Sequence, residues 1–236
     1  MASVHPTNKR FHVGRLAIFA GAALFSTVLT TKSFALVDVR VSGGMYNGTA
    51  KVTATGSGGV VAPEYESIKN KGTQITANVD ISPLPLVPFS IGLFYSSVAA
   101  KGSTELVNTK WSGARGGIDF AVWAPVPKIK PYLRAGYYMF GKEKLTLSLK
   151  DSPPGVGDVS TAYEGSAKGY QIGLGVGFSL APFVSIYLDY SMDKTTLTTK
   201  SVNATVGSTS STVDLTEDFK AKNDASTISV GLGVSI

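Results

Sequence analysis

Cysteine is absent from the chain, and histidine is almost absent. The 236 residues include no cysteine and two histidines, His5 and His12. Both histidines lie in the first 35 residues, a stretch unlike the remainder. If these 35 residues are removed by cleavage, the remaining mature protein contains no cysteine and no histidine. Disulfides, thiol chemistry and His-based metal sites are then excluded from it. We therefore expect no metal site and no cofactor.

Acidic residues are missing from those first 35 positions. One lysine and two arginines precede an apolar run at 16–30, and the small residues Ser33 and Ala35 follow it. A charged head, an apolar middle and a small-residue exit are typical of a secretory signal peptide. The run is shorter than the roughly 20 residues that a membrane-spanning helix needs. The sequence predicts a signal peptide at 1–35, cleaved after Ala35, and one mature domain at 36–236.

A large excess of charge is also missing from the mature domain. Four of the 22 basic residues and none of the 16 acidic residues lie in the predicted signal peptide. The basicity of the whole chain therefore belongs mostly to the export signal. It gives no argument for binding to nucleic acid, and we expect no nucleic-acid partner.

Helical periodicity is not evident after residue 36, and alternation of apolar and polar residues takes its place. Eight segments alternate, near residues 37–45, 73–82, 88–97, 111–124, 132–149, 169–180, 184–193 and 227–236. Most have about the 9–11 residues with which a tilted strand crosses a membrane. In the fifth segment, the apolar face from Leu133 to Met139 is expected to resume at Leu145, Leu147 and Leu149.

Arginine is scarce after residue 35, and all three arginines lie mid-segment on the polar faces. Aspartates share these faces, whereas lysines fall in the connections and at strand ends. If the strands form a barrel whose polar face meets water outside, that face should carry many lysines. If the polar face instead lines the narrow lumen of the barrel, Arg–Asp pairs are favoured, because the guanidinium makes paired hydrogen bonds. The pattern predicts a lumen charge network of Asp38, Arg40, Asp80, Arg115, Asp119, Arg134, Asp189 and Asp193. Strand order further predicts that Arg134 pairs with Asp119 and that Arg40 pairs with Asp80.

Glycines and aromatic residues also indicate that the polar faces point into a lumen and the apolar faces point outward to lipid. Gly173, Gly175 and Gly177 share a polar face, where they would make room for large inward side chains. Tyr170 and Phe178 lie on the apolar face of the same segment, roughly 20 Å apart along a barrel axis. This spacing is close to the height of the apolar band and predicts one aromatic at each membrane interface.

The connections alternate in length. Short, proline-bearing links are expected at 83–87, 125–127 and 181–182, and long polar links at 46–72, 98–110, 150–168 and 194–224. Tight periplasmic turns and extended outer loops are typical of outer-membrane barrels. The predicted fold class is all-β: an eight-stranded antiparallel up-and-down transmembrane β-barrel. The rival reading is a soluble periplasmic barrel that binds a small ligand, which would fold in buffer without detergent.

Four features carry a family resemblance: the signal peptide, the segment 131–137, the segment 187–190 and a final strand that ends at Ile236. On these features, the chain from 36 to 236 resembles the small OmpA-like outer-membrane barrels. The resemblance implies the bacterial outer membrane, insertion by the barrel assembly machinery, and surroundings of outer-membrane lipid and lipopolysaccharide. We expect a monomer. Members of the family usually end in an aromatic residue, where this chain has Ile236. No peptidoglycan-binding domain is expected.

Three classes of function compete. Barrels that modify lipid A rely on a catalytic histidine to activate a serine, and the mature chain would have none, so we expect no enzyme. Side chains usually fill the interior of an eight-stranded barrel. We therefore expect a structural or surface-interaction role, with the long outer loops meeting any extracellular partner. The alternative is a narrow, porin-like channel passing small solutes or hydrophobic compounds, if the glycines leave a path.

Overall fold

The computed structural model describes residues 37–53, 67–82, 88–124, 126, 128–151, 155 and 157–236, with residues 53, 216 and 217 described by backbone alone. The predicted signal peptide lies outside these residues. None of the described segments is a helix long and apolar enough to cross a membrane.

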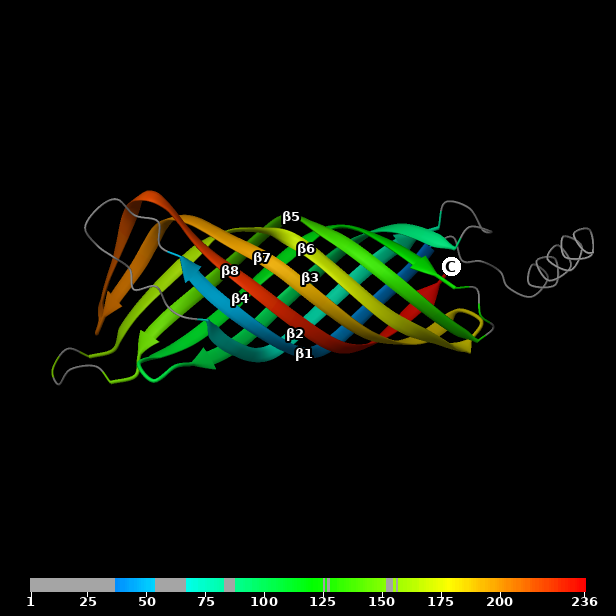
Figure 1. Ribbon diagram of the computed structural model, residues 1–236, viewed down its shortest axis with the longest axis horizontal. Coiled ribbons are helices and arrows are strands. Elements are labelled where there is room, and N and C mark those ends of the chain that lie inside the picture. The colour runs from blue at the N-terminus through cyan, green and yellow to red at the C-terminus, as the bar shows by residue number, and fades with distance from the viewer. Residues whose placement is uncertain are drawn as a thin grey trace, which may run out of the picture. The chain divides into compact units, whose positions relative to one another are not determined.

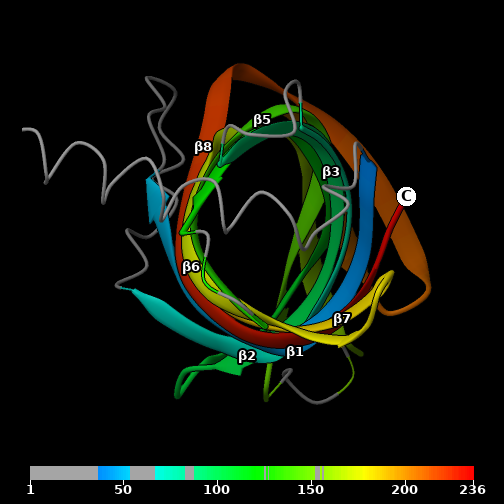
Figure 2. The same ribbon diagram turned by 90° about the vertical axis from the view of Figure 1, so that its right-hand side faces the viewer.

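Eight strands make up the fold. They are β1 (Val37–Thr53), β2 (Ile68–Ile81), β3 (Phe89–Ser103), β4 (Val107–Trp123), β5 (Ile129–Leu149), β6 (Val159–Ala181), β7 (Val184–Val206) and β8 (Thr209–Ser235). Each strand pairs antiparallel with its neighbour in sequence, and β1 pairs with β8 to close a barrel. Figure 1 shows the barrel from the side and Figure 2 along its axis. The predicted eight-stranded antiparallel up-and-down barrel is confirmed.

The strands are longer than the alternation predicts. The expected long links at 98–110 and 194–224 are wrong, because β3 and β4 are joined by residues 104–106 alone, and β7 and β8 by residues 207–208. Strand β6 likewise begins inside the expected link at 150–168, and β1 and β2 extend into that at 46–72. These stretches are rich in threonine and valine, which favour strands. Gly207 supplies the positive φ of 58° that the two-residue turn requires.

The expected face of β5 is also wrong beyond its midpoint. Leu133 is 66% exposed on the outer surface, but Leu145 is fully buried inside the barrel and Leu147 nearly so. Leu133 and Leu145 both have odd numbers, so an uninterrupted strand would place them on the same face. The pairing of β5 with β6 shifts between Tyr138 and Lys142. One such irregularity exchanges the two faces of a strand.

In the half of the barrel that holds Ile236 and the short turns, apolar side chains point outward. Leu93 is 65% exposed, Ile172 57% and Val230 59%. Arginine and aspartate side chains point inward at the same level. This is the orientation predicted for a barrel in lipid, and the reverse of a soluble barrel with an apolar core.

In the other half of the barrel the pattern inverts. On β1, outward Val41 and Met45 give way to outward Lys51, while inward Arg40 gives way to inward Ala50. A packed apolar cluster fills this half, and we call it the apolar cap. It consists of Tyr46, Ala50, Val52, Ile68, Val98, Ala100, Trp111, Leu145, Leu147, Leu197, Phe219, Ala221 and Ala225, with Tyr163 and Leu215 packed against it. A barrel with an apolar interior and a polar outer surface is built for water.

Candidate functional site

The inward side chains below the apolar cap form two charge clusters. In the lower cluster, Arg40 Nη2 lies 3.4 Å from Asp80 Oδ2, and Arg134 Nη2 lies 2.9 Å from the same oxygen. Arg134 Nε lies 3.1 Å from Asp119 Oδ2. Asp80 thus joins the two arginines. The structure places in contact both pairs that strand order predicts, Arg134 with Asp119 and Arg40 with Asp80.

Aromatic rings enclose the lower cluster. The guanidinium of Arg40 lies 4.5 Å from the ring centroid of Tyr187 and 5.0 Å from that of Tyr132, and its Nη1 donates to the Tyr132 hydroxyl at 2.5 Å. Asp189 Oδ1 lies 3.6 Å from Arg40 Nη1. These contacts hold Arg40 by charge, hydrogen bond and cation–π attraction together.

The lower cluster ends at the rim that carries the short turns. Asp38 accepts a hydrogen bond from the Tyr187 hydroxyl at 2.8 Å and lies 3.7 Å from Lys130 Nζ. Lys130 Nζ lies 4.2 Å from the ring centroid of Trp123. Aromatic rings and an ion pair therefore occupy the interior at this rim.

The upper cluster centres on Arg115, whose side chain is 1% exposed. Its Nη1 donates to Glu143 Oε1 at 3.1 Å, and its Nη2 lies 3.4 Å from Asp193 Oδ2. The Tyr138 ring stacks against the guanidinium, with its centroid 4.5 Å from Cζ, and its hydroxyl donates to Asp193. Arg115 and Asp193 therefore belong to a separate group from the other predicted network residues.

Sequence reasoning missed Glu143 and Lys130. Glu143 lies beyond the irregularity in β5, so the alternation read from the first half of the strand assigns it to the wrong side. A charged residue shortly before Leu145 and Leu147, which are both buried, is the signal that a change of face would explain. Lys130 lies at the start of β5, next to a short turn, where a lysine in sequence gives no sign that it points inward.

Glycines leave the space that the tyrosines occupy. A Cβ on Gly175 would lie 2.6 Å from Tyr132 ring and hydroxyl atoms, and a Cβ on Gly177 would lie 2.8 Å from the Tyr187 ring. The lumen of an eight-stranded barrel is narrow. A bare backbone on β6 therefore allows large rings to cross it.

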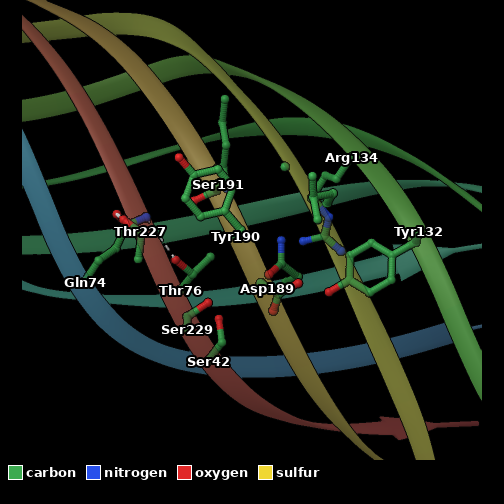
Figure 3. Close-up of a pocket in the computed structure, with 14 residues that line it drawn as sticks. Ser42, Gln74, Thr76, Tyr132, Arg134, Asp189, Tyr190, Ser191, Thr227 and Ser229 are labelled. Carbon is green, nitrogen blue, oxygen red and sulfur yellow. Dashed lines mark hydrogen bonds between the residues drawn. The ribbon is translucent and has the colours of Figure 1, made fainter.

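A small polar cavity of about 30 Å³ remains beside the lower cluster. Figure 3 shows Arg134, Tyr132 and Asp189 on one side of it, and Gln74 and Thr227 on the other. This volume holds a water molecule or two rather than a substrate. The apolar cap lies above this cavity and the upper cluster, and its members Trp111, Leu145 and Leu197 are fully shielded from solvent.

The arrangement neutralises charge and does not expose it. In the part of the chain that the structure describes, all six inward carboxylates lie within 4 Å of a lysine or arginine. Among the described residues, no group of three or more acidic, histidine or cysteine side chains is placed to hold a metal ion. The geometry is that of a structural filling.

Solved structures of outer-membrane proteins resemble this chain at low identity. Ail of Yersinia pestis is 13% identical, with 83% of this chain and 97% of that chain covered and a TM-score of 0.38. OprG of Pseudomonas aeruginosa is 11% identical (86% and 97% covered, TM-score 0.45). The outer-membrane protease OmpT of Escherichia coli is 12% identical (88% and 99% covered, TM-score 0.42).

No protein-family model matches the chain. No curated protein matches it significantly. The scores and identities of the solved structures are low, so the architecture stated above rests on the strand pairing of this chain itself.

Proposed function

We propose that this chain is a bacterial outer-membrane β-barrel, exported by residues 1–35 and cleaved after Ala35, and inserted by the barrel assembly machinery. Its role is structural or one of surface interaction, and its lumen is closed. The observation that carries this proposal is the inversion of the barrel. The half that holds Ile236 is apolar outside and charged inside, whereas the half that holds the apolar cap is polar outside and apolar inside. A single barrel with both patterns suits a protein that crosses lipid and then stands in water.

The closed lumen argues against a channel. An ion would have to pass the Arg40 and Arg134 cluster, then Arg115, and then the apolar cap, whose Trp111 and Leu145 are fully buried. Hydrophobic constrictions oppose ion entry because they do not solvate charge. We infer that the unmodified barrel does not conduct.

A non-enzymatic role follows from the chemistry of the interior. The chain beyond residue 36 has no histidine or cysteine, and the inward carboxylates are held by cations. A nucleophile without a base to activate it is weak. We therefore place the specific role of the protein on its outer surface.

That surface is built from strands. We call the outward apolar surface in the half of the barrel that holds Ile236 the apolar belt. Beyond this belt, β7 and β8 continue as a paired ladder to the turn at residues 207–208. An extracellular partner would therefore meet a strand-built surface more than flexible loops. Paired strands are better ordered than free loops, so binding would require little loop ordering.

Two measurements test this proposal. A heat-modifiable shift in gel mobility of the membrane-extracted protein, with folding in micelles but not in buffer, is expected for the outward-apolar barrel. Folding in buffer alone would support the soluble rival. In planar bilayers we expect no steady conductance, with a large porin as the positive control. Regular ion-sized steps would favour the narrow channel that the sequence leaves as the alternative.

A further inference from the structure

Outward lysines encircle the barrel just beyond its apolar belt. Every one of the eight strands carries at least one, and all are exposed. We call this set the lysine collar. It consists of Lys51, Lys69, Lys71, Lys101, Lys110, Lys142, Lys144, Lys168, Lys194, Lys200, Lys220 and Lys222.

The collar begins where the belt ends. On β6, Lys168 lies two residues beyond the outward Tyr170, and on β7, Lys194 lies two residues beyond the outward Met192. Two residues of a tilted strand advance roughly 5 Å along the barrel axis. The first collar ammonium groups therefore stand at the level of the lipid headgroups. Among the described residues at the opposite rim, the lysines are Lys128 and Lys130, and Lys130 is paired with Asp38.

Like charges face one another within the collar. Lys71 is the register partner of Lys101, and Lys101 is also the register partner of Lys110 on its other side. The outer partners of this row are Asn47 and Thr146, which carry no charge. Like charges directly opposite one another destabilise a sheet. A row of three lysines on adjacent strands is favourable where an anion lies against it.

We propose that the lysine collar binds the phosphate groups of the outer-leaflet glycolipid, with Lys71, Lys101 and Lys110 as the principal contact. This inference rests on the outer-membrane location proposed above. Lysines next to a membrane surface attract anionic headgroups, and an ammonium group binds phosphate as a point charge. The ring form selects the ligand: a protein partner would approach one side, whereas a leaflet surrounds the barrel and meets every strand. In an outer membrane, the phosphorylated lipid at this level is lipopolysaccharide.

The test measures binding of purified lipid A to the folded full-length protein in zwitterionic micelles. The test variant is Lys71→Gln/Lys101→Gln/Lys110→Gln. The matched variant Lys71→Arg/Lys101→Arg/Lys110→Arg keeps the charge. A second control, Lys128→Gln/Lys150→Gln, removes charge outside the collar. Gel mobility before and after heating shows that each variant is folded.

We expect the glutamine variant to bind bis-phosphorylated lipid A at least about tenfold more weakly, while the arginine variant and the second control bind like the parent. Raised ionic strength should weaken binding to the parent, and dephosphorylated lipid A should bind the parent and the glutamine variant equally weakly. Unchanged affinity of the glutamine variant overturns the proposal, as does an equal loss in either control. Tight binding of dephosphorylated lipid A also overturns it. Each of these results leaves the proposed closed barrel intact, because folding is scored separately.

Discussion

The guanidinium of Arg115 lies 3.1 Å from the carboxylate of Glu143, and each side chain is 1% exposed. Asp193 lies on the other side of the same guanidinium. Arg115→Met would leave two buried carboxylates without a cation, and we expect it to lower the free energy of unfolding by about 3–5 kcal/mol. Adding Glu143→Gln should restore part of the loss, because it removes one of the uncompensated charges. Urea titration of the folded protein in micelles measures both.

The control for this pair is Glu105→Gln, since Glu105 is exposed in the short link between β3 and β4. It should change stability by less than about 0.5 kcal/mol, alone or with Arg115→Met. If Glu143→Gln fails to improve the Arg115→Met variant, the two side chains do not balance one another.

Arg134 and Asp119 should show energetic coupling. Their atoms Nε and Oδ2 lie 3.1 Å apart, so removing either partner disturbs the other. Asp119→Ala and Arg134→Ala together should destabilise less than the sum of the single changes, by about 1–3 kcal/mol. The comparison cycle pairs Asp119→Ala with Glu143→Gln, which belongs to the other cluster and should be additive. Additive losses for Asp119 and Arg134 would show that the pairing is wrong.

Alternation predicts much of this barrel because lipid and lumen impose opposite demands on neighbouring residues. On β6, outward Ile172 and Leu174 alternate with Gly173 and Gly175, and this two-residue period identifies the strand without a structure. Strand order then places Arg134 beside Asp119. The contact between Arg40 and Tyr132, which lie on β1 and β5, needs the closed barrel and side-chain geometry, which no local pattern records.

The outer half of the barrel is harder to predict for a physical reason. There, water replaces lipid, so the apolar residues move to the other face and strands resemble polar links. Leu145 shows the effect: read with Leu133 it belongs outside, but the irregularity after Tyr138 turns it inward. The sequence signal of this change is a lysine next to a small apolar residue on one strand: Lys101 points outward and its neighbour Ala100 points inward.

Gly175 is expected to tolerate no side chain. A Cβ there would lie 2.6 Å from Tyr132 atoms, so Gly175→Ala should lower the free energy of unfolding by about 1–3 kcal/mol through overpacking. Gly43→Ala is the control, since a Cβ at Gly43 meets no atom within 4 Å, and it should be neutral or slightly stabilising. Adding Tyr132→Leu to Gly175→Ala should recover less than the full loss, because it also removes the hydroxyl that Arg40 contacts. Equal stability of the two alanine variants would contradict the packing described for the lumen.

The apolar cap should contribute to stability as a soluble core does. Leu145 is fully buried in the cap, whereas Leu149, on the same strand, is 43% exposed. We expect Leu145→Ala to destabilise by about 2–5 kcal/mol and Leu149→Ala by less than about 1 kcal/mol. The measurement is the denaturant midpoint of the two variants in the same micelles. A similar midpoint for both would mean that the cap is not packed in the folded protein.

Single cysteines can locate the boundary between belt and collar, because the chain has no cysteine of its own. Leu93→Cys and Leu133→Cys lie in the outward belt, and Lys101→Cys and Lys144→Cys lie in the collar. A membrane-impermeant maleimide applied to intact cells should label the two collar sites and spare the two belt sites, since a thiolate in water reacts and a thiol in hydrocarbon does not. After detergent extraction and unfolding, all four should react, which controls for expression. Labelling of Leu93→Cys as fast as Lys101→Cys in cells would place the belt in water and remove the basis for treating this barrel as a membrane protein.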